Sequence, residues 1–237
     1  MPMNGSNICI SVALITRNRP ESLNRSLSNL RSQSVQPYEI IVSDDSDPEL
    51  ASQTEAVAKS WNCKYISGPR RGMQANHNCA HTACTGTHIR TMDDDHEFPE
   101  EHFKIIQELV ESDTHSVWLV GEYNQKSTDT SIMQLPGEVQ PRGFRKPIVN
   151  YDDCYAISDG SAIYPRNIIN KHKFLEYFKY AGELEFGARL QILGYRIRYS
   201  PRTYIIHISD AYHDPREIQV SSFIGSYLTY AVYKKKL

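Results

Sequence analysis

Three adjacent aspartates, Asp93, Asp94 and Asp95, are the residues whose type and spacing point most directly to chemistry. They follow the apolar segment 87–92, which predicts a strand. Neighbouring carboxylates repel one another and need a cation or free water. A hard divalent ion such as Mg²⁺ or Mn²⁺ prefers carboxylate oxygens and would let this acidic end hold a diphosphate. The triplet therefore predicts a cation site, with a solvated acidic loop as the alternative.

A second acidic cluster, Asp44, Asp45 and Asp47, follows the short apolar segment 39–43. Asp47 precedes Pro48, which predicts the N-cap of a helix that reaches about Trp61. Asp44 and Asp45 could serve the same turn and cap. In parallel sheets, ligands bind beyond the carboxyl ends of the strands, where both clusters would lie. This coincidence favours a binding site over two unrelated loops.

The elements that must position these aspartates alternate between strands and helices. Strands are expected at 8–15, 39–43, 64–66, 87–92 and 117–120, and helices at 20–30, 48–61 and 73–84 and from residue 99 onward. This alternation predicts an α/β fold, a Rossmann-like α/β/α sandwich with a mostly parallel central sheet.

The second half of the chain is less regular. Residues 126–150 predict a long loop, 151–164 an extended segment, 183–193 a helix ended by Gly194, and 195–198 and 204–208 two strands. A last helix is expected at 222–233, followed by three lysines. That helix could make peripheral contact with a membrane. Alternatively, it packs on the core or on a partner subunit of an oligomer.

Composition excludes several classes of protein. The 237 residues carry 26 Lys and Arg against 28 Asp and Glu, a net charge of −2, so nucleic acid is not an expected partner. The five cysteines show no CxxC spacing, which favours reduced thiols in a cytoplasmic protein. The N-terminus lacks a signal-type apolar core, and no apolar stretch approaches the roughly 18 residues of a membrane span.

The ordered motifs IIVSDDSD, RRGMQANHN and IRTMDDD follow a buried strand and resemble the family 2 inverting glycosyltransferases, which have the GT-A fold. The match is close over 11–47 and traceable to about His207. The resemblance implies one GT-A domain over residues 1–237. Residues 1–122 would bind a nucleotide sugar, and residues 123–237 would bind the acceptor.

The implied activity is metal-dependent, inverting transfer of a sugar from a nucleoside-diphosphate sugar, with UDP favoured. The acceptor would be a hydroxyl of a glycan, a glycolipid or a small molecule, with Mn²⁺ or Mg²⁺ as cofactor. Asp45 would accept an imide N–H of the base, with Asp44 beside it. Other nucleotide contacts are implied for Thr16, Arg17 and Asn18 and for Arg71, with Arg70 competing for the last role.

The same resemblance gives the aspartate triplet its roles. Asp95 would bind the metal directly, while Asp93 and Asp94 would contact the ribose or metal-bound water, with Asp93 a further metal ligand. His207 would join the metal site, although a histidine at a strand end is often structural. Gly160 and Ser161 match the small-residue loop beneath the donor sugar, the alternative being an ordinary turn.

Glu183 falls on the family's catalytic base when Arg189, Leu190 and Gly194 are aligned with the family pattern, and Glu185 is the second choice. Gly182 replaces the first acid of the usual pair. Both glutamates could instead serve only the helix N-terminus. The altered pair leaves a non-catalytic nucleotide-sugar binder, or a partner subunit, as the alternative function. A pyrophosphorylase is disfavoured because TRNRPES lacks the glycine-rich loop that such an enzyme needs.

Overall fold

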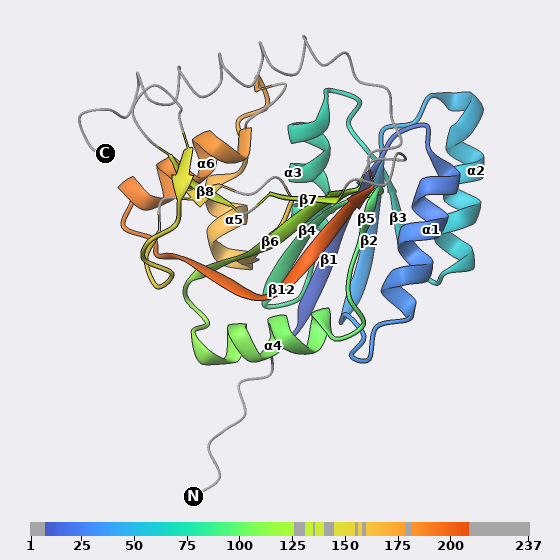
Figure 1. Cartoon of the computed structure of the whole chain (residues 1–237). Coiled ribbons are helices and arrows are strands. Elements are labelled where there is room, and N and C mark those ends of the chain that lie inside the picture. Colours follow the sequence, from blue (N-terminus) through green and yellow to red (C-terminus); the bar gives the residue numbers. More distant parts are fainter. Residues whose placement is uncertain are drawn as a thin grey trace, which may run out of the picture.

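A mixed sheet forms the centre of the protein, in strand order β3-β2-β1-β4-β11-β6-β12-β5, with β7 added beside β6 (Figure 1). The computed structural model describes residues 8–125, 131–134, 136–139, 145–154, 156–157, 160–178 and 182–208. The strands are β1 Ile10–Thr16, β2 Glu39–Asp44, β3 Lys64–Ser67, β4 His88–Asp93, β5 His96–Glu97, β6 Val117–Gln125, β7 Ser131–Gln134, β11 Ala162–Pro165 and β12 Ile197–Ile208. Strands β3, β2, β1, β4, β6 and β12 run in one direction, and β11, β5 and β7 oppose them.

Strand β1 shows why this sheet lies in the middle of the molecule. All seven of its residues are buried, and alternate side chains enter different cores because successive residues of a strand face opposite ways. Val12 and Leu14 pack in one hydrophobic cluster, and Ala13 and Ile15 in another. The continuous apolar run of β1 is therefore the pattern of a strand covered on both faces.

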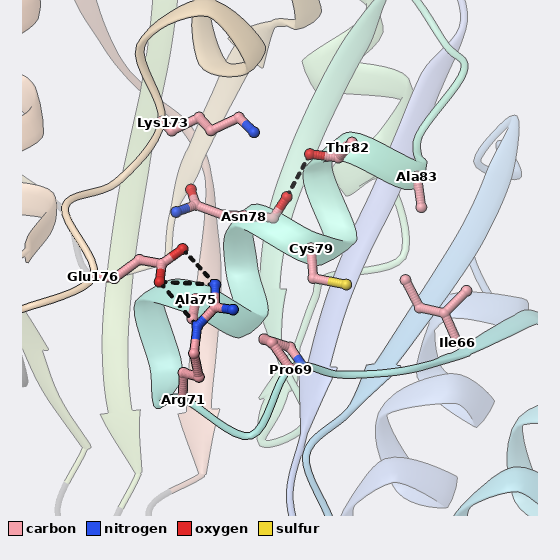
Figure 2. A pocket seen from close by; sticks show the side chains of 10 residues that line it. All are labelled: Ile66, Pro69, Arg71, Ala75, Asn78, Cys79, Thr82, Ala83, Lys173 and Glu176. Atoms are coloured by element: carbon pink, nitrogen blue, oxygen red, sulfur yellow. Dashed lines mark hydrogen bonds and ion pairs between the residues drawn. The ribbon is translucent and has the colours of Figure 1, made fainter.

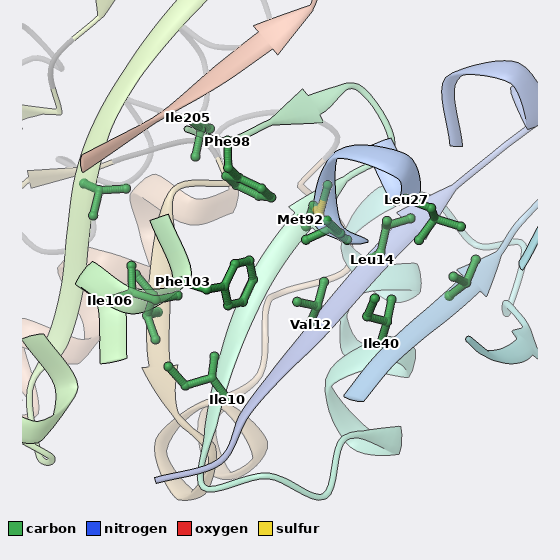
Figure 3. Packing of buried hydrophobic residues seen from close by; sticks show 14 of the residues in the cluster. Ile10, Val12, Leu14, Leu27, Ile40, Met92, Phe98, Phe103, Ile106 and Ile205 are labelled. Carbon is green, nitrogen blue, oxygen red and sulfur yellow. The ribbon is translucent and has the colours of Figure 1, made fainter. Parts of the chain in front are cut away.

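Helices cover both faces (Figure 1). The first cluster takes side chains from α1 Pro20–Arg31 and α4 His102–Ser112 (Figure 3) and also from α2 Pro48–Ser60. The second takes them from α3 Met73–Ala83, α5 Arg166–His172 and α6 Gly182–Ile192. In α1, Leu23, Leu27 and Leu30 are fully buried at helical spacing. The predicted three-layer α/β sandwich with a mostly parallel sheet is confirmed.

Several local predictions differ from the structure. Helix α4 begins at His102 because residues 99–102 form a turn closed by a hydrogen bond from His102 N to Pro99 O. The two strands expected at 195–198 and 204–208 are one strand, β12, whose pairing with β6 shifts between Ser200 and Tyr204. Pro201 lies in this shift, where a missing N–H interrupts no ladder bond.

The segment expected to be a long loop contains strands in its described parts. Besides β7, it includes β8 Gly137–Val139 and β9 Arg145–Pro147, which join β10 Ala156–Ile157 in a small antiparallel sheet. Strands of two to four residues are too short to show a period of two in the sequence. Helix α5 was not predicted either.

The chain's division into two halves remains a functional prediction, since β6 runs across residue 122 and both halves contribute to the main sheet. The expected helix at 222–233 and its lysine tail lie outside the described residues. Within the described part of the chain, no helix combines the length and the apolar character needed to cross a membrane.

Candidate active site

The register of three parallel strands brings the two acidic clusters to one edge of the sheet. Thr16 at the end of β1 pairs with Asp44 of β2, and Ile15 pairs with Asp93 of β4. Thr16 Oγ1 also donates a hydrogen bond of 2.5 Å to Asp94 Oδ2. The carboxyl ends of β1, β2 and β4 therefore form one polar site, as the sequence predicted.

Arg19 is the cation closest to the aspartate triplet, and sequence analysis missed it. Its guanidinium lies 2.5 Å from Asp94 Oδ1 and 2.9 Å from Asp95 Oδ2. Burial raises the pKa of Asp94 to about 7, although Arg19 opposes this shift. The protein thus neutralises part of the triplet with its own arginine, so a metal ion is not the only source of positive charge.

Asp93 is surrounded by imidazoles. Its Oδ1 lies 3.2 Å from His77 Nε2, and its Oδ2 lies 3.9 Å from His96 Nε2. Its backbone N–H donates to His96 Nδ1 at 3.2 Å, which fixes the ring. Burial alone would raise the pKa of Asp93, but contacts with His77 and His96 hold it well below the ordinary value.

Asp95, His96 and His207 form a cluster with the composition of a metal site. One ligand atom from each lies within 4.8 Å of the other two. His207 Nε2 faces Asp95 Oδ1 at 3.4 Å, and its Nδ1 hydrogen-bonds to Glu122 Oε1 at 3.0 Å. A histidine whose second nitrogen is held by a carboxylate is the usual arrangement around protein-bound metals.

His96 is fully buried, and its Nε2 faces Asp93 and Asp95 at 3.9 Å. Burial lowers the pKa of His96 to about 4, so the ring stays neutral. Because Nδ1 accepts from the Asp93 N–H, the single ring proton lies on Nε2 and points at these carboxylates. For His207, burial alone would lower the pKa, but the Asp95 and Glu122 carboxylates raise it to about 11. A proton on His207 and a metal ion would therefore neutralise the same carboxylates.

The metal set implied by the resemblance was Asp95, Asp93 and His207. The structure groups Asp95 and His207 with His96 instead, while Asp93 lies nearest to His77. The spacing of His96 from the other histidines of the sequence matches no metal motif, so the sequence did not predict its place in this cluster. Its short distance in sequence from Asp95 was the available signal.

At the end of β2, the carboxylates meet neutral donors. Asp44 accepts hydrogen bonds from Ser46 N at 2.8 Å and Tyr65 Oη at 2.9 Å. Asp45 Oδ1 accepts from Arg70 N at 2.9 Å, in a turn where Gly68 approaches so closely that a Cβ would lie 2.2 Å from the same oxygen. Burial raises the pKa of Asp45. The turn at 68–70 is therefore built around the Asp45 carboxylate, whereas both oxygens of Asp44 already have structural partners.

The loop after β1 holds the remaining residues expected near the base. Asn18 adopts φ 58° and exchanges two hydrogen bonds with Asp47, at 2.6 and 2.8 Å. Arg17 is exposed and lies 3.7 Å from Asp47. Asp47 is the N-cap residue of α2, as predicted, but its side chain makes no cap hydrogen bond. It binds Asn18 instead.

Arg71 points into a groove of about 500 Å³ between β3, α3 and the segment after α5 (Figure 2). Its guanidinium forms a bidentate pair with Glu176, with contacts of 2.9 to 3.2 Å. The groove is lined by Ile66, Pro69, Arg71, Ala75, Asn78, Cys79, Thr82, Ala83, Lys173 and Glu176. None of the site aspartates is among these residues, and the nucleotide role of Arg71 stays a prediction.

Gly160 lies against the ring of His96, and Ser161 follows it in the chain. Gly160 has φ 78°, and a Cβ there would come 2.5 Å from His96 Cε1. Its carbonyl accepts from the buried Arg90 guanidinium, and Ser161 Oγ donates to Val120 O at 3.1 Å. Their described contacts therefore support His96 and β6, and their predicted role beneath the donor sugar remains a prediction.

The two glutamates of α6 differ sharply. Glu185 is buried and forms a bidentate pair with Arg189, at 2.7 and 3.0 Å. Glu183 is partly exposed, and its Oε1 accepts a hydrogen bond of 3.1 Å from Gln74 Nε2. Of the two candidates, Glu183 has the carboxylate better placed to receive a proton.

The polar run QANHN explains much of the site's rigidity. Asn76 binds Ser43 Oγ and Ser43 O at 2.6 and 3.1 Å, and Asn78 binds both Phe174 N and Phe174 O at 2.9 Å. Because Gln74 and His77 reach Glu183 and Asp93, helix α3 links β2, the first aspartate of the triplet and the candidate base. Polar residues on a helix that lies between buried strands were the signal, and sequence analysis did not use it.

Residues 11–173 match the family model described as glycosyl transferase family 2. The chain belongs to this glycosyltransferase family. The match spans β1 to the end of α5 and includes both acidic strand ends. A search of curated proteins found no match.

Solved glycosyltransferase structures share the fold. A structure of GalNAc-T7 with UDP, GalNAc and Mn²⁺ matches with a TM-score of 0.76 and 14% identity, covering 97% of this chain and 50% of that one. S. aureus TarS matches with a TM-score of 0.63 and 19% identity, covering 83% of this chain and 36% of that one. TarS 1–349 in complex with UDP-GlcNAc matches with a TM-score of 0.63 and 18% identity, covering 90% and 64%. The chain thus spans about a third of full-length TarS and half of GalNAc-T7.

Proposed function

We propose that this glycosyltransferase uses a UDP-linked sugar and a divalent cation, and transfers the sugar with inversion to an acceptor hydroxyl. The observation that carries the proposal is the cluster of Asp95, His96 and His207 at the carboxyl end of β4, in which one ligand atom from each residue lies within 4.8 Å of the other two. Solved structures of the same fold, GalNAc-T7 and TarS 1–349, contain UDP with Mn²⁺ and UDP-GlcNAc, respectively.

Asp95 and His207 would hold the cation, and the ring of His96 lies beside them. Bound there, Mn²⁺ or Mg²⁺ supplies a charge that stabilises the departing diphosphate. At the neighbouring strand end, Asp45 accepts the imide N–H of uracil, since a carboxylate offers only acceptors. The two strand ends would then bind opposite ends of one nucleoside diphosphate.

Glu183 serves as the base in this proposal. Its carboxylate removes the proton of the acceptor hydroxyl while that oxygen bonds to the anomeric carbon. The bond between that carbon and the diphosphate oxygen breaks at the same time, and the electron pair leaves with UDP. Attack opposite the leaving group inverts the configuration.

A donor panel tests the proposal. UDP-GlcNAc, UDP-GalNAc, UDP-glucose and UDP-galactose are first screened by thermal shift, with Mn²⁺ and with EDTA. UDP release is then measured for the wild type and for Glu183→Gln. Mn²⁺-dependent release that falls by about 100-fold or more in Glu183→Gln supports the proposal. Donor binding with no turnover by the wild type would show a nucleotide-sugar binder instead.

A further inference from the structure

Position 182 departs from the family's usual acidic pair, and the structure shows what fills the space of the missing side chain. A Cβ on Gly182 would lie 2.6 Å from Gln74 Nε2 and 2.7 Å from Gln74 Cδ. The backbone of α6 and the Gln74 amide are therefore in direct contact, and only glycine permits this approach.

The Gln74 side chain is fixed by its surroundings. It is 1% exposed, extends from the first turn of α3, and donates from Nε2 to Glu183 Oε1 at 3.1 Å. A carboxylate only accepts hydrogen bonds, so the NH₂ end of the amide must face Glu183. This orientation leaves the buried Oε1 without a hydrogen-bond partner among the described residues.

We propose that Gln74 is a positioning residue for the base Glu183, and that Gly182 is the glycine that lets it reach that carboxylate. This inference rests on the proposed role of Glu183. Gln74 is one helical turn from His77, which contacts Asp93. Helix α3 therefore sets the base at a fixed place relative to the aspartate triplet. At position 182 this chain lacks the acidic side chain of the family, and the Gln74 amide from α3 occupies that space.

The first test replaces the amide without changing its length. Gln74→Met is expected to lower the rate of Mn²⁺-dependent UDP release about tenfold at saturating donor, while the donor KM and the UDP affinity stay unchanged. UDP affinity is measured by calorimetry, which does not depend on turnover. Replacing a purely structural residue would not lower kcat while leaving the donor KM and the UDP affinity unchanged.

The second test uses glycines near the two ends of α6 as a matched pair. Gly182→Ala should lower the rate about as much as Gln74→Ala, because its Cβ would displace the Gln74 amide from Glu183. Gly194→Ala meets no neighbouring atom within 4 Å but has φ 85°. It should lower the melting temperature and leave the rate unchanged.

A double-mutant cycle of Gln74→Ala and Gly182→Ala completes the test. Once the amide is gone, Gly182→Ala should cause no further loss of rate. Additive losses would overturn the steric link between the two positions. A normal rate in Gln74→Met and Gln74→Ala, with a slow Glu183→Gln, would overturn the inference alone. A normal rate in Glu183→Gln would instead overturn the proposed function.

Discussion

The carboxyl ends of β2 and β4 both carry runs of aspartate, yet the groups that contact these aspartates differ. At β2, the donors to Asp44 and Asp45 are two backbone N–H groups and a tyrosine hydroxyl. At β4, the triplet meets the guanidinium of Arg19 and the imidazoles of His77, His96 and His207. The two ends look alike in sequence, but the partners of their aspartates differ in charge.

This difference separates two kinds of recognition. Neutral donors orient a carboxylate without cancelling its charge, which suits the reading of a neutral base. Cationic and imidazole partners make the charge at β4 exchangeable, because a proton, an arginine or a metal ion can each balance it. This contrast supports the proposal that the end of β2 binds the base and the end of β4 binds the diphosphate.

The largest effect is expected from removing the built-in cation at β4. Arg19→Met leaves Asp94, which is fully buried, without its ion pair and should lower the free energy of unfolding by about 3 kcal/mol in urea titrations. Arg17→Met, at an exposed arginine two residues away, should change it by less than about 0.5 kcal/mol. Adding Asp94→Asn to Arg19→Met should recover most of the loss. Equal losses of unfolding free energy in Arg19→Met and Arg17→Met would contradict the role of Arg19 as the built-in cation at β4.

The next prediction concerns Mn²⁺ binding at the carboxyl end of β4. Asp95→Asn should weaken Mn²⁺ binding roughly 100-fold, because it removes a charged ligand from the cluster with His96 and His207. Binding can be followed by the electron paramagnetic resonance signal of free Mn²⁺. Asp45→Asn should leave it unchanged, and a comparable loss in that variant would show that the two ends are not separate.

At β2, the prediction concerns the base rather than the metal. Asp45→Asn should weaken UDP binding about tenfold, or about 1.4 kcal/mol, in calorimetry with EDTA present. CDP provides the control because cytosine has no imide N–H for a carboxylate to accept. The affinity for CDP should therefore change little, and an equal loss for both nucleotides would argue against base reading by Asp45.

A neutral donor at β2 should contribute modestly to stability. Tyr65→Phe removes the hydroxyl that binds Asp44 and should lower the free energy of unfolding by about 1 kcal/mol. Tyr38 is 59% exposed, so Tyr38→Phe serves as the control with little expected change. A loss as large as that of Arg19→Met would show that β2 depends on charge as strongly as β4.

The smallest effect is a pH dependence. Burial raises the pKa of Asp45, so the folded state binds its proton more tightly than the unfolded state does. The stability linked to this group is fully present below the ordinary carboxyl value of 3.8 and is lost as the pH rises through the raised pKa. Unfolding free energies of the wild type minus those of Asp45→Asn should therefore decrease with increasing pH. The opposite slope would contradict the burial of this carboxylate.

The sequence was informative where a pattern reports burial. The apolar run of β1 and the leucines of α1 predicted the layers, and the aspartates after β2 and β4 predicted the edge of the sheet that holds the site. These features depend on the local period of a strand or a helix and on a topological rule for parallel sheets. They need no knowledge of distant contacts.

The partners of the aspartates could not be predicted in this way. Arg17 and Arg19 look equivalent in TRNRP, but Asn18 has φ 58° and helix α1 starts at Pro20, so only Arg19 reaches β4. His96 meets His207 through the pairing of β5 with β12, which are about 100 residues apart. The pairing of Glu185 with Arg189, one turn further along the same helix, was likewise not predicted.

Gly160 restricts the geometry of the proposed cation site, although it is not one of the residues proposed to hold the ion. With the imidazole of His96 against its α-carbon, one added methyl group would have to push the ring toward the aspartates or bend the chain. Natural variants of this enzyme that carry any larger residue at position 160 should therefore also differ at position 96. Such paired replacement, traced among relatives, would show that position 160 stays glycine to make room for the imidazole at position 96.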